Sequence, residues 1–195
     1  MESFDRLGRD LSAALLELQT RIRNGDTVSA EFIEQIITLA YVKGANIAQQ
    51  LQGALLGGAT NYTPAQLAAI RASARQRYER IQELFDTWVT EQGEVSRAQV
   101  NKYLELATDT TIRNAYAQRA FELATERQAR FKVWVRTSPV TKPRDHHDAL
   151  NGVKVRIDET FTVSGVAVAY PHDWDALPSQ SEWLRCGHGV LYTRS

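Results

Sequence analysis

The stretch Lys132-Val133-Trp134-Val135-Arg136-Thr137 decides how the chain is divided, because its apolar residues alternate where the preceding ones do not. Val133 and Val135 fall on one side of an extended chain and Trp134 on the other, since successive side chains of a strand point to opposite faces. A second segment, residues 153–157, alternates in the same way. A third strand is expected at 163–170, which contains a glycine, and a short fourth at 190–192. The last third of the chain therefore predicts a small antiparallel sheet.

Before residue 130 the apolar residues recur every three or four positions, which is typical of helices packed by one face. This periodicity predicts helices over residues 4–22, 29–55, 63–92 and 96–123. Thr63-Pro64 is a start signal, with a capping hydroxyl before a proline at the first helical position. Ser29 and Ser96 are expected to cap two other helices. The β-branched run Thr108–Thr111 predicts a break in the last of them.

Together these patterns predict an α+β protein. Residues 1–107 are expected to form a helical bundle or hairpin array, and residues 108–195 a small C-terminal α+β module with a short antiparallel sheet. The 195 residues carry a formal net charge of +0, and the charges divide evenly on either side of residue 130. Neither region is basic enough to indicate extensive phosphate binding. The lack of a signal peptide, of a long apolar run and of a second cysteine indicates a protein without membrane contact that stays inside the cell that makes it.

The residues that can carry chemistry gather in the last third, where all four histidines lie. His147, Cys186 and His188, with His146 or His172 as a fourth ligand, offer the atom types that zinc prefers. Their spacing does not fit the usual ligand pairs, because adjacent histidines diverge in a strand and Cys186-x-His188 is shorter than a common knuckle. Hydrogen bonds to loop backbone and ion pairs with neighbouring aspartates are the competing interpretation. We therefore expect no cofactor and less than one equivalent of zinc in the purified protein.

The same histidines raise two enzymatic alternatives, a metal-dependent nuclease and a toxin-like effector, which would use the His146/His147 and Cys186/His188 cluster. A nuclease of the His-Asn-His kind needs a base for water, a metal-bound phosphate and a second half with Asn and His on a helix. Asn151 stands next to Gly152, which suits a turn better than a metal site. No asparagine follows it in the sequence. The sequence therefore predicts no enzyme and no catalytic residue.

The order of several short stretches is more specific than any one cluster. Thr111-Ile112-Arg113-Asn114-Ala115-Tyr116 precedes the strand with Trp134. Then come Arg144-Asp145-His146-His147-Asp148-Ala149-Leu150-Asn151-Gly152, Asp158-Glu159-Thr160-Phe161, Tyr170-Pro171 and Leu184-Arg185-Cys186. This succession, from about residue 108 to 192, resembles the C-terminal domain of the phage Mu F-like minor head proteins. That family has an arginine-bearing helix, a strand with a central tryptophan, an Arg-x-x-His or Cys-x-x-Cys turn and an Asx-Gly pair in this order.

The resemblance implies a structural motif made of Trp134, Arg144, His147, Asn151, Gly152 and Cys186. Trp134 would anchor a small core, and Asn151-Gly152 would make a tight turn into the next strand. Arg144 and His147 are expected to pin that turn to the loop around Cys186 by hydrogen bonds. Relatives with four cysteines are plausible zinc binders. At those places this chain has Arg144, His147, Leu184 and Cys186, so only two can ligate unless His188 takes part.

The resemblance further implies a role in head morphogenesis, as a minor capsid protein of a tailed bacteriophage near the portal or the capsid interior. Expected partners are the portal and major capsid proteins, with possible contact to packaged DNA and an oligomeric state in the virion. The expected locations are the virion and, during assembly, the host cytoplasm. Because the chain ends at Ser195 directly after the module, no C-terminal toxin is expected. A host-encoded helical adaptor is a further alternative, which genome context would separate.

One cluster of arginines falls at helical spacing and is the candidate for DNA contact. It comprises Arg71, Arg75, Arg77 and Arg80. Basic residues on one helix face attract phosphates, but an ordinary solvated face has the same pattern. The solvated face is the favoured interpretation.

Overall fold

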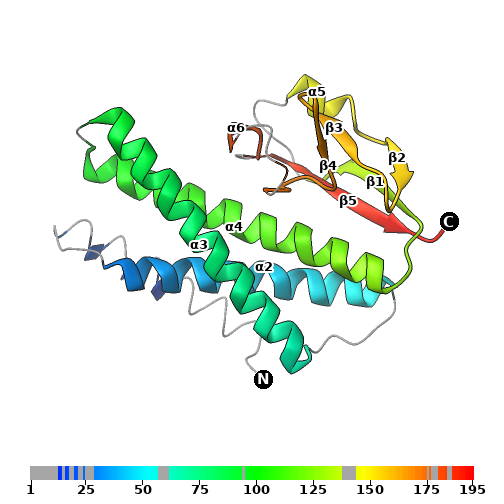
Figure 1. Ribbon diagram of the computed structural model, residues 1–195, viewed down its shortest axis with the longest axis horizontal. Helices are drawn as coiled ribbons and strands as arrows, with labels where there is room; N and C mark the ends of the chain where they lie inside the picture. Colours follow the sequence, from blue (N-terminus) through cyan, green and yellow to red (C-terminus); the bar gives the residue numbers. More distant parts are fainter. Residues whose placement is uncertain are drawn as a thin grey trace. The chain divides into compact units, whose positions relative to one another are not determined.

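The computed structural model describes residues 13–14, 16–17, 20–21, 24, 29–56, 62–93, 95–137, 144–174, 176, 180–183 and 186–195. Within these residues it confirms the α+β class: long helices come first and a small antiparallel sheet follows (Figure 1). The long helices are α2 (Ala30–Leu56), α3 (Pro64–Gln92) and α4 (Arg97–Glu126). In the described part of the chain, no helix is both long and apolar enough to cross a bilayer.

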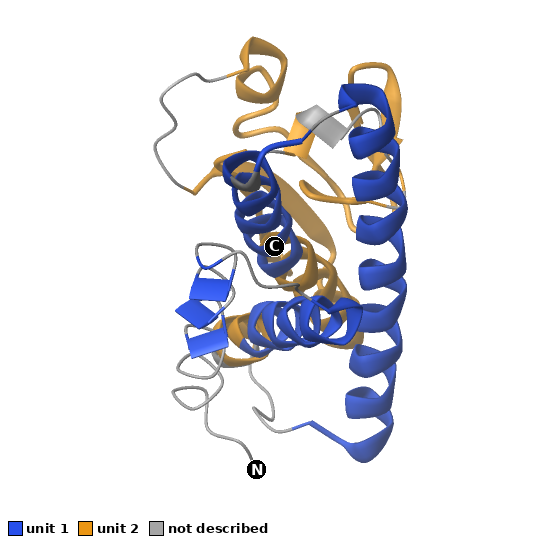
Figure 2. Cartoon of the chain, turned by 90° about the vertical axis from the view of Figure 1, so that its left-hand side faces the viewer, with its two compact units in different colours: residues 1–46, 62–112 blue, residues 47–61, 113–195 orange. Residues whose placement is uncertain are grey.

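The chain forms two compact units (Figure 2). The first comprises residues 1–46 and 62–112, and the second comprises residues 47–61 and 113–195. The residues of α2 and α4 are therefore divided between the units. The division of the chain into regions 1–107 and 108–195 stays a prediction.

The three predicted helix starts are confirmed. The Ser29 hydroxyl accepts a hydrogen bond from the backbone N–H of Phe32, at 3.3 Å. Thr63 and Gln66 form a capping box, in which the Thr63 hydroxyl accepts from the Gln66 N–H and the Gln66 side chain accepts from the Thr63 N–H. Ser96 is bonded to Gln99 in the same reciprocal way. Each cap satisfies backbone donors that have no partner inside the helix.

The predicted break at Thr108–Thr111 is wrong, because α4 continues through these residues. Three threonine hydroxyls, those of Thr108, Thr110 and Thr111, donate to the carbonyl four residues earlier. Bonded in this way, the hydroxyls do not compete for the backbone of a new cap. All three side chains are buried, so packing outweighs their modest intrinsic helix propensity.

The first unit is held by apolar residues from its helices. Ile36 and Ala40 of α2 pack with Leu104 of α4, and Val100 and Ile112 cover this cluster. The buried side of α3 consists of Ile70, Ala74, Arg77 and Ile81. Tyr103 also stacks on Trp88, with 5.2 Å between the ring centroids, and donates its hydroxyl hydrogen to the Ile81 carbonyl.

Replacing Thr63 by alanine is expected to destabilise this unit by about 1 kcal/mol, the typical contribution of a capping hydroxyl. The substitution removes the acceptor of the Gln66 N–H and breaks the capping box. Urea unfolding followed by far-ultraviolet circular dichroism measures the change. Thr63→Ser keeps the hydroxyl and is expected to unfold like the wild type, so an equal loss in both variants would contradict a capping role.

In the second unit, β1 (Phe131–Arg136) is the middle strand of a three-stranded antiparallel sheet, between β2 (Lys154–Arg156) and β5 (His188–Thr193). Trp134 is opposite Val190 of β5, and Lys132 is opposite both Val155 of β2 and Tyr192 of β5. Lys132 and Trp134 lie on the buried face of β1, while Val133 and Val135 are only half-buried. The predicted alternation in β1 and β2 is thus confirmed.

The prediction of one continuous strand over residues 163–170 is wrong. The chain there forms a hairpin of β3 (Phe161–Val163) and β4 (Val166–Val168), with Val163 opposite Val166. The turn residues Ser164 and Gly165 have φ angles of 50° and 81°. Two successive positive φ angles match the twist of antiparallel strands in a two-residue turn. The glycine therefore reverses the chain direction and is not part of a continuous strand.

An apolar cluster of this unit is built largely from alanines and includes Ala120 of α4, the residue after Arg119. Ala48, Ala120, Ala124 and Ala129 pack with Tyr192. The buried Arg119 guanidinium donates to the Gln49 side chain at 3.0 and 3.1 Å and to Glu122 and Glu126, each at 2.9 Å. Removing these acceptors would leave a buried charge without a partner, which is strongly destabilising.

Candidate functional site

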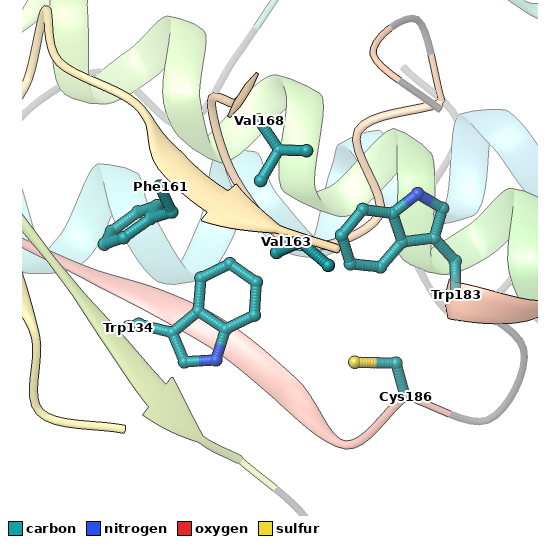
Figure 3. Packing of buried hydrophobic residues seen from close by; sticks show 6 residues of the cluster. All are labelled: Trp134, Phe161, Val163, Val168, Trp183 and Cys186. Carbon is teal, nitrogen blue, oxygen red and sulfur yellow. The ribbon is translucent and has the colours of Figure 1, made fainter. Parts of the chain in front are cut away.

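Trp134 occupies the centre of the core of the second unit. It is fully buried and packs with Phe161, Val163, Val168, Trp183 and Cys186 (Figure 3). Its ring lies edge-on to Phe161, with 5.1 Å between centroids, and 5.9 Å from the ring of His147. The expected role of Trp134 as the anchor of a small core is confirmed.

The Asn151-Gly152 pair makes the predicted turn. Gly152 has a φ of 85°, which a residue with a Cβ adopts only at a cost, and its N–H donates to the Trp134 carbonyl at 2.8 Å. The Asn151 side chain accepts from the backbone N–H of Arg136 at 2.9 Å. The turn is thereby fastened to the backbone of β1 at Trp134 and at Arg136. The Asn151 side-chain oxygen therefore binds backbone and is not directed at a ligand.

His147, Cys186 and His188 come together although they lie far apart in the sequence. His147 belongs to the short helix α5 (Asp145–Asp148), Cys186 precedes β5, and His188 begins that strand. The Cys186 sulfur lies 3.4 Å from Nδ1 of His147 and 3.6 Å from Nδ1 of His188. The exposed fractions of the three residues are 1%, 2% and 5%. We call these three residues the N₂S cluster.

Two carboxylates contact the imidazoles of His147 and His188, each at Nε2. Glu182, in the short helix α6 (Gln180–Trp183), lies 3.0 Å from Nε2 of His147 and 2.8 Å from Nε2 of His146. Asp148 lies 3.0 Å from Nε2 of His188 and also accepts from Arg136. Each imidazole of the cluster therefore contacts a carboxylate through Nε2 and the Cys186 sulfur through Nδ1.

Further contacts fix these carboxylates and the cysteine. The Ser164 hydroxyl donates to Glu182 at 2.9 Å, and the Arg144 Nε lies 4.0 Å from the same carboxylate. Arg113 of α4 donates to the Cys186 carbonyl at 3.3 Å. Arg144 thus reaches α6, and His147 reaches Cys186. The expectation that hydrogen bonds tie the turn to the loop around Cys186 is confirmed for His147, and Arg144 pairs with Glu182.

The electrostatics of the cluster follow from its burial. Burial lowers the pKa of His147 to about 4 and also lowers the pKa of His188. Burial likewise raises the pKa of the Cys186 thiol. For Glu182, burial alone would raise the pKa, but hydrogen bonds from His146 and Ser164 outweigh it and the pKa is lowered. Near pH 7 the three residues are neutral and the carboxylate is charged.

Within the described residues, two groups could hold a metal ion: the N₂S cluster, and His146 with His147 and Glu182. His172, weighed from the sequence as a fourth ligand, belongs to neither group. It is buried beside Trp183, with 5.8 Å between ring centroids, and burial lowers its pKa to about 3. Leu184 and Arg185 lie outside the described residues. Sequence reasoning singled out the three residues and expected ion pairs with neighbouring aspartates, such as the one between His188 and Asp148, but missed Glu182.

The four arginines proposed for DNA contact do not form one surface. Arg77 is buried, so its guanidinium does not face solvent, and this part of the prediction is wrong. Arg71, Arg75 and Arg80 are exposed, and Arg75 and Arg80 pair with Glu79 and Glu83. At about 100° per residue, Arg80 lies half a turn away from Arg71. These features agree with the favoured interpretation of an ordinary solvated helix.

No protein-family model, curated protein or solved structure matches the chain.

Proposed function

We propose that the chain is a structural minor head protein of a tailed bacteriophage, acting in head morphogenesis near the portal or the capsid interior. One observation carries the proposal. The residues on which the Mu F-like resemblance rests come from separate stretches, yet Trp134, His147, Asn151, Gly152 and Cys186 form one continuous set of contacts. A chance likeness in sequence order has no reason to select residues that build one core.

The chemistry of the same residues also supports a structural role. A general base must reach the proton of a water or a substrate. The His147 ring is buried, and each of its nitrogens lies against a protein atom, Sγ of Cys186 or a Glu182 oxygen. The Asn151 oxygen is bonded to backbone. These contacts favour residues that hold the module together over residues of a nuclease or a toxin-like effector.

The experiment is made on the phage whose genome carries the sequence. We expect mass spectrometry to detect the chain in nuclease-treated, salt-washed virions, and electron cryomicroscopy to place it at the portal vertex or inside the shell. A null mutant is expected to give defective or empty heads and to be rescued by the wild-type gene. Normal yields of infectious phage from the null mutant, together with absence of the chain from wild-type virions, would refute the proposal.

The enzymatic alternative has its own test on the purified protein. We expect no cleavage of double- or single-stranded DNA with Mg²⁺, Mn²⁺ or Zn²⁺. Cleavage that needs a metal and disappears in His147→Ala, but persists in His146→Gln, would assign a nuclease site to the module. A cleavage activity unaffected by His147→Ala would point to a contaminant.

A further inference from the structure

The hydrogen atoms of the N₂S cluster cannot satisfy all of its contacts. A carboxylate accepts hydrogen bonds and does not donate them, so Glu182 and Asp148 place the ring hydrogens of His147 and His188 on Nε2. In a neutral imidazole the other nitrogen, Nδ1, then carries a lone pair. Both lone pairs are directed at the Cys186 sulfur, at 3.4 and 3.6 Å.

One thiol hydrogen can serve only one of these two nitrogens. The other contact joins a nitrogen lone pair to a sulfur lone pair inside a buried core, where an unmatched polar contact is costly. A second proton or a cation between the three atoms removes the mismatch. A second proton would place a charged imidazolium in the buried core, since both rings are almost fully buried, and burying a charge is costly. A metal ion bound by Nδ1, Nδ1 and a thiolate satisfies all three atoms at once.

The distances fit such an ion. Zinc bonds sulfur at about 2.3 Å and imidazole nitrogen at about 2.0 Å, so tetrahedral geometry places the two ligand atoms about 3.5 Å apart. The two sulfur–nitrogen distances in the cluster are 3.4 and 3.6 Å, and the ligand atoms of all three residues lie within 4.8 Å of one another. Two nitrogens and one sulfur are a donor set that suits zinc.

The surroundings are those of a metal site. Histidine ligands commonly donate their other N–H to a carboxylate, which fixes the ring and strengthens the ligand. Here Glu182 does this for His147, and Asp148 does it for His188. In addition, the Trp134 Nε1–H is buried with no hydrogen-bond partner in the described part of the chain. Figure 3 shows the nitrogen-bearing edge of this indole turned to the side where the Cys186 sulfur lies, and a metal-bound thiolate is an acceptor for it.

We propose that His147 Nδ1, His188 Nδ1 and Cys186 Sγ bind one Zn²⁺, with Glu182 and Asp148 as the carboxylates behind the two histidines. The spacing of these residues in the sequence led us to expect less than one equivalent of zinc, whereas their spacing in the fold favours a bound ion. Binding replaces the Cys186 thiol hydrogen, which is released to solvent as a proton. The proposed site does not depend on the head-protein assignment.

The test uses the full chain without a histidine tag, produced with added Zn²⁺ and passed over a desalting column. We expect one equivalent of zinc by mass spectrometry of the metal. X-ray absorption is expected to show one sulfur and otherwise nitrogen or oxygen neighbours. Replacement by Co²⁺ is expected to give a thiolate-to-metal charge-transfer band. Far less than one equivalent, or a zinc ion without a sulfur neighbour, would overturn the proposal even if every variant failed to fold.

Variants assign the ligands. Cys186→Ser and His188→Gln are expected to lose stoichiometric zinc and the charge-transfer band. Asp148→Asn keeps the ligands and is expected to weaken zinc binding about 10- to 100-fold in competition with a chromophoric chelator, the usual effect of losing such a carboxylate. His146→Gln is the matched control, because His146 also contacts Glu182 but lies outside the N₂S cluster, and it is expected to keep the metal. Wild-type affinity in Cys186→Ser, or loss of zinc in His146→Gln alone, would refute the assignment.

Discussion

Replacing Trp134 by alanine is expected to lower the free energy of unfolding of the second unit by about 3–5 kcal/mol, the range for a large aromatic residue in a close-packed core. Trp134 is 0% exposed and contacts residues from β3, α5 and β5, so its removal leaves a cavity that several elements border. Single domains are stable by only about 5–15 kcal/mol, so much of the total would be lost. Urea unfolding, monitored by far-ultraviolet circular dichroism, measures the difference.

Leu191 provides the control for this prediction. It lies in β5, on a strand that pairs with β1, but is 51% exposed. Leu191→Ala is therefore expected to cost less than about 1 kcal/mol, as surface substitutions usually do. Trp134→Phe should fall between the two, since it keeps part of the ring. Equal effects of Trp134→Ala and Leu191→Ala would mean that the core is not built around the indole.

The parts of the fold that were predicted correctly are those encoded by neighbouring residues. The alternation around Trp134, the capping box at Thr63 and the Asn151-Gly152 turn each depend on a few consecutive positions. The Ser164-Gly165 turn was encoded in the same local way, because Ser-Gly is a common turn pair, and the signal was overlooked. The break at Thr108–Thr111 was wrong because burial, which is not a local property, holds those threonines in the helix.

The candidate site could be predicted only in part. Cys186 contacts His147 across 39 positions and Asp148 contacts His188 across 40, and spacing rules for metal ligands describe only ligands on one short turn. The sequence did not indicate Glu182 as a partner of the histidines, because a single glutamate before a tryptophan is an ordinary surface pattern. The sequence indicated the residue types, whereas the distances between them depend on the fold, in which Asp148 of α5 and His188 of β5 are in contact.

Lys132 is the clearest residue that sequence reasoning missed. It is 1% exposed, and its ammonium group lies 5.1 Å from the Phe121 ring centroid and 5.5 Å from that of Phe161. Burial lowers the pKa of Lys132 from 10.5 to about 8, against the attraction of Asp173 and other nearby carboxylates. Below pH 8 both the folded and the unfolded chain carry the proton, so the folded state bears the full cost of a buried charge. Between pH 8 and 10.5 only the unfolded chain binds the proton, and this residue's contribution to stability therefore rises with pH.

Lys132→Met is accordingly expected to stabilise the second unit by up to about 3.5 kcal/mol at pH 7, since the pKa falls from 10.5 to about 8 and one unit of pKa corresponds to about 1.4 kcal/mol. The variant keeps the length and packing of the side chain but has no charge to bury. Urea unfolding at several pH values from 7 to 10 is expected to show this advantage shrinking as the wild-type lysine loses its proton. The comparison with wild type cancels the titration of Cys186 and the tyrosines. The exposed Lys154, which lies over Phe131 at 4.3 Å, is the control: Lys154→Met should give no such gain. A destabilised Lys132→Met would show that the buried ammonium contributes to stability in its charged form. A gain that does not depend on pH would show that the buried charge is not its cause.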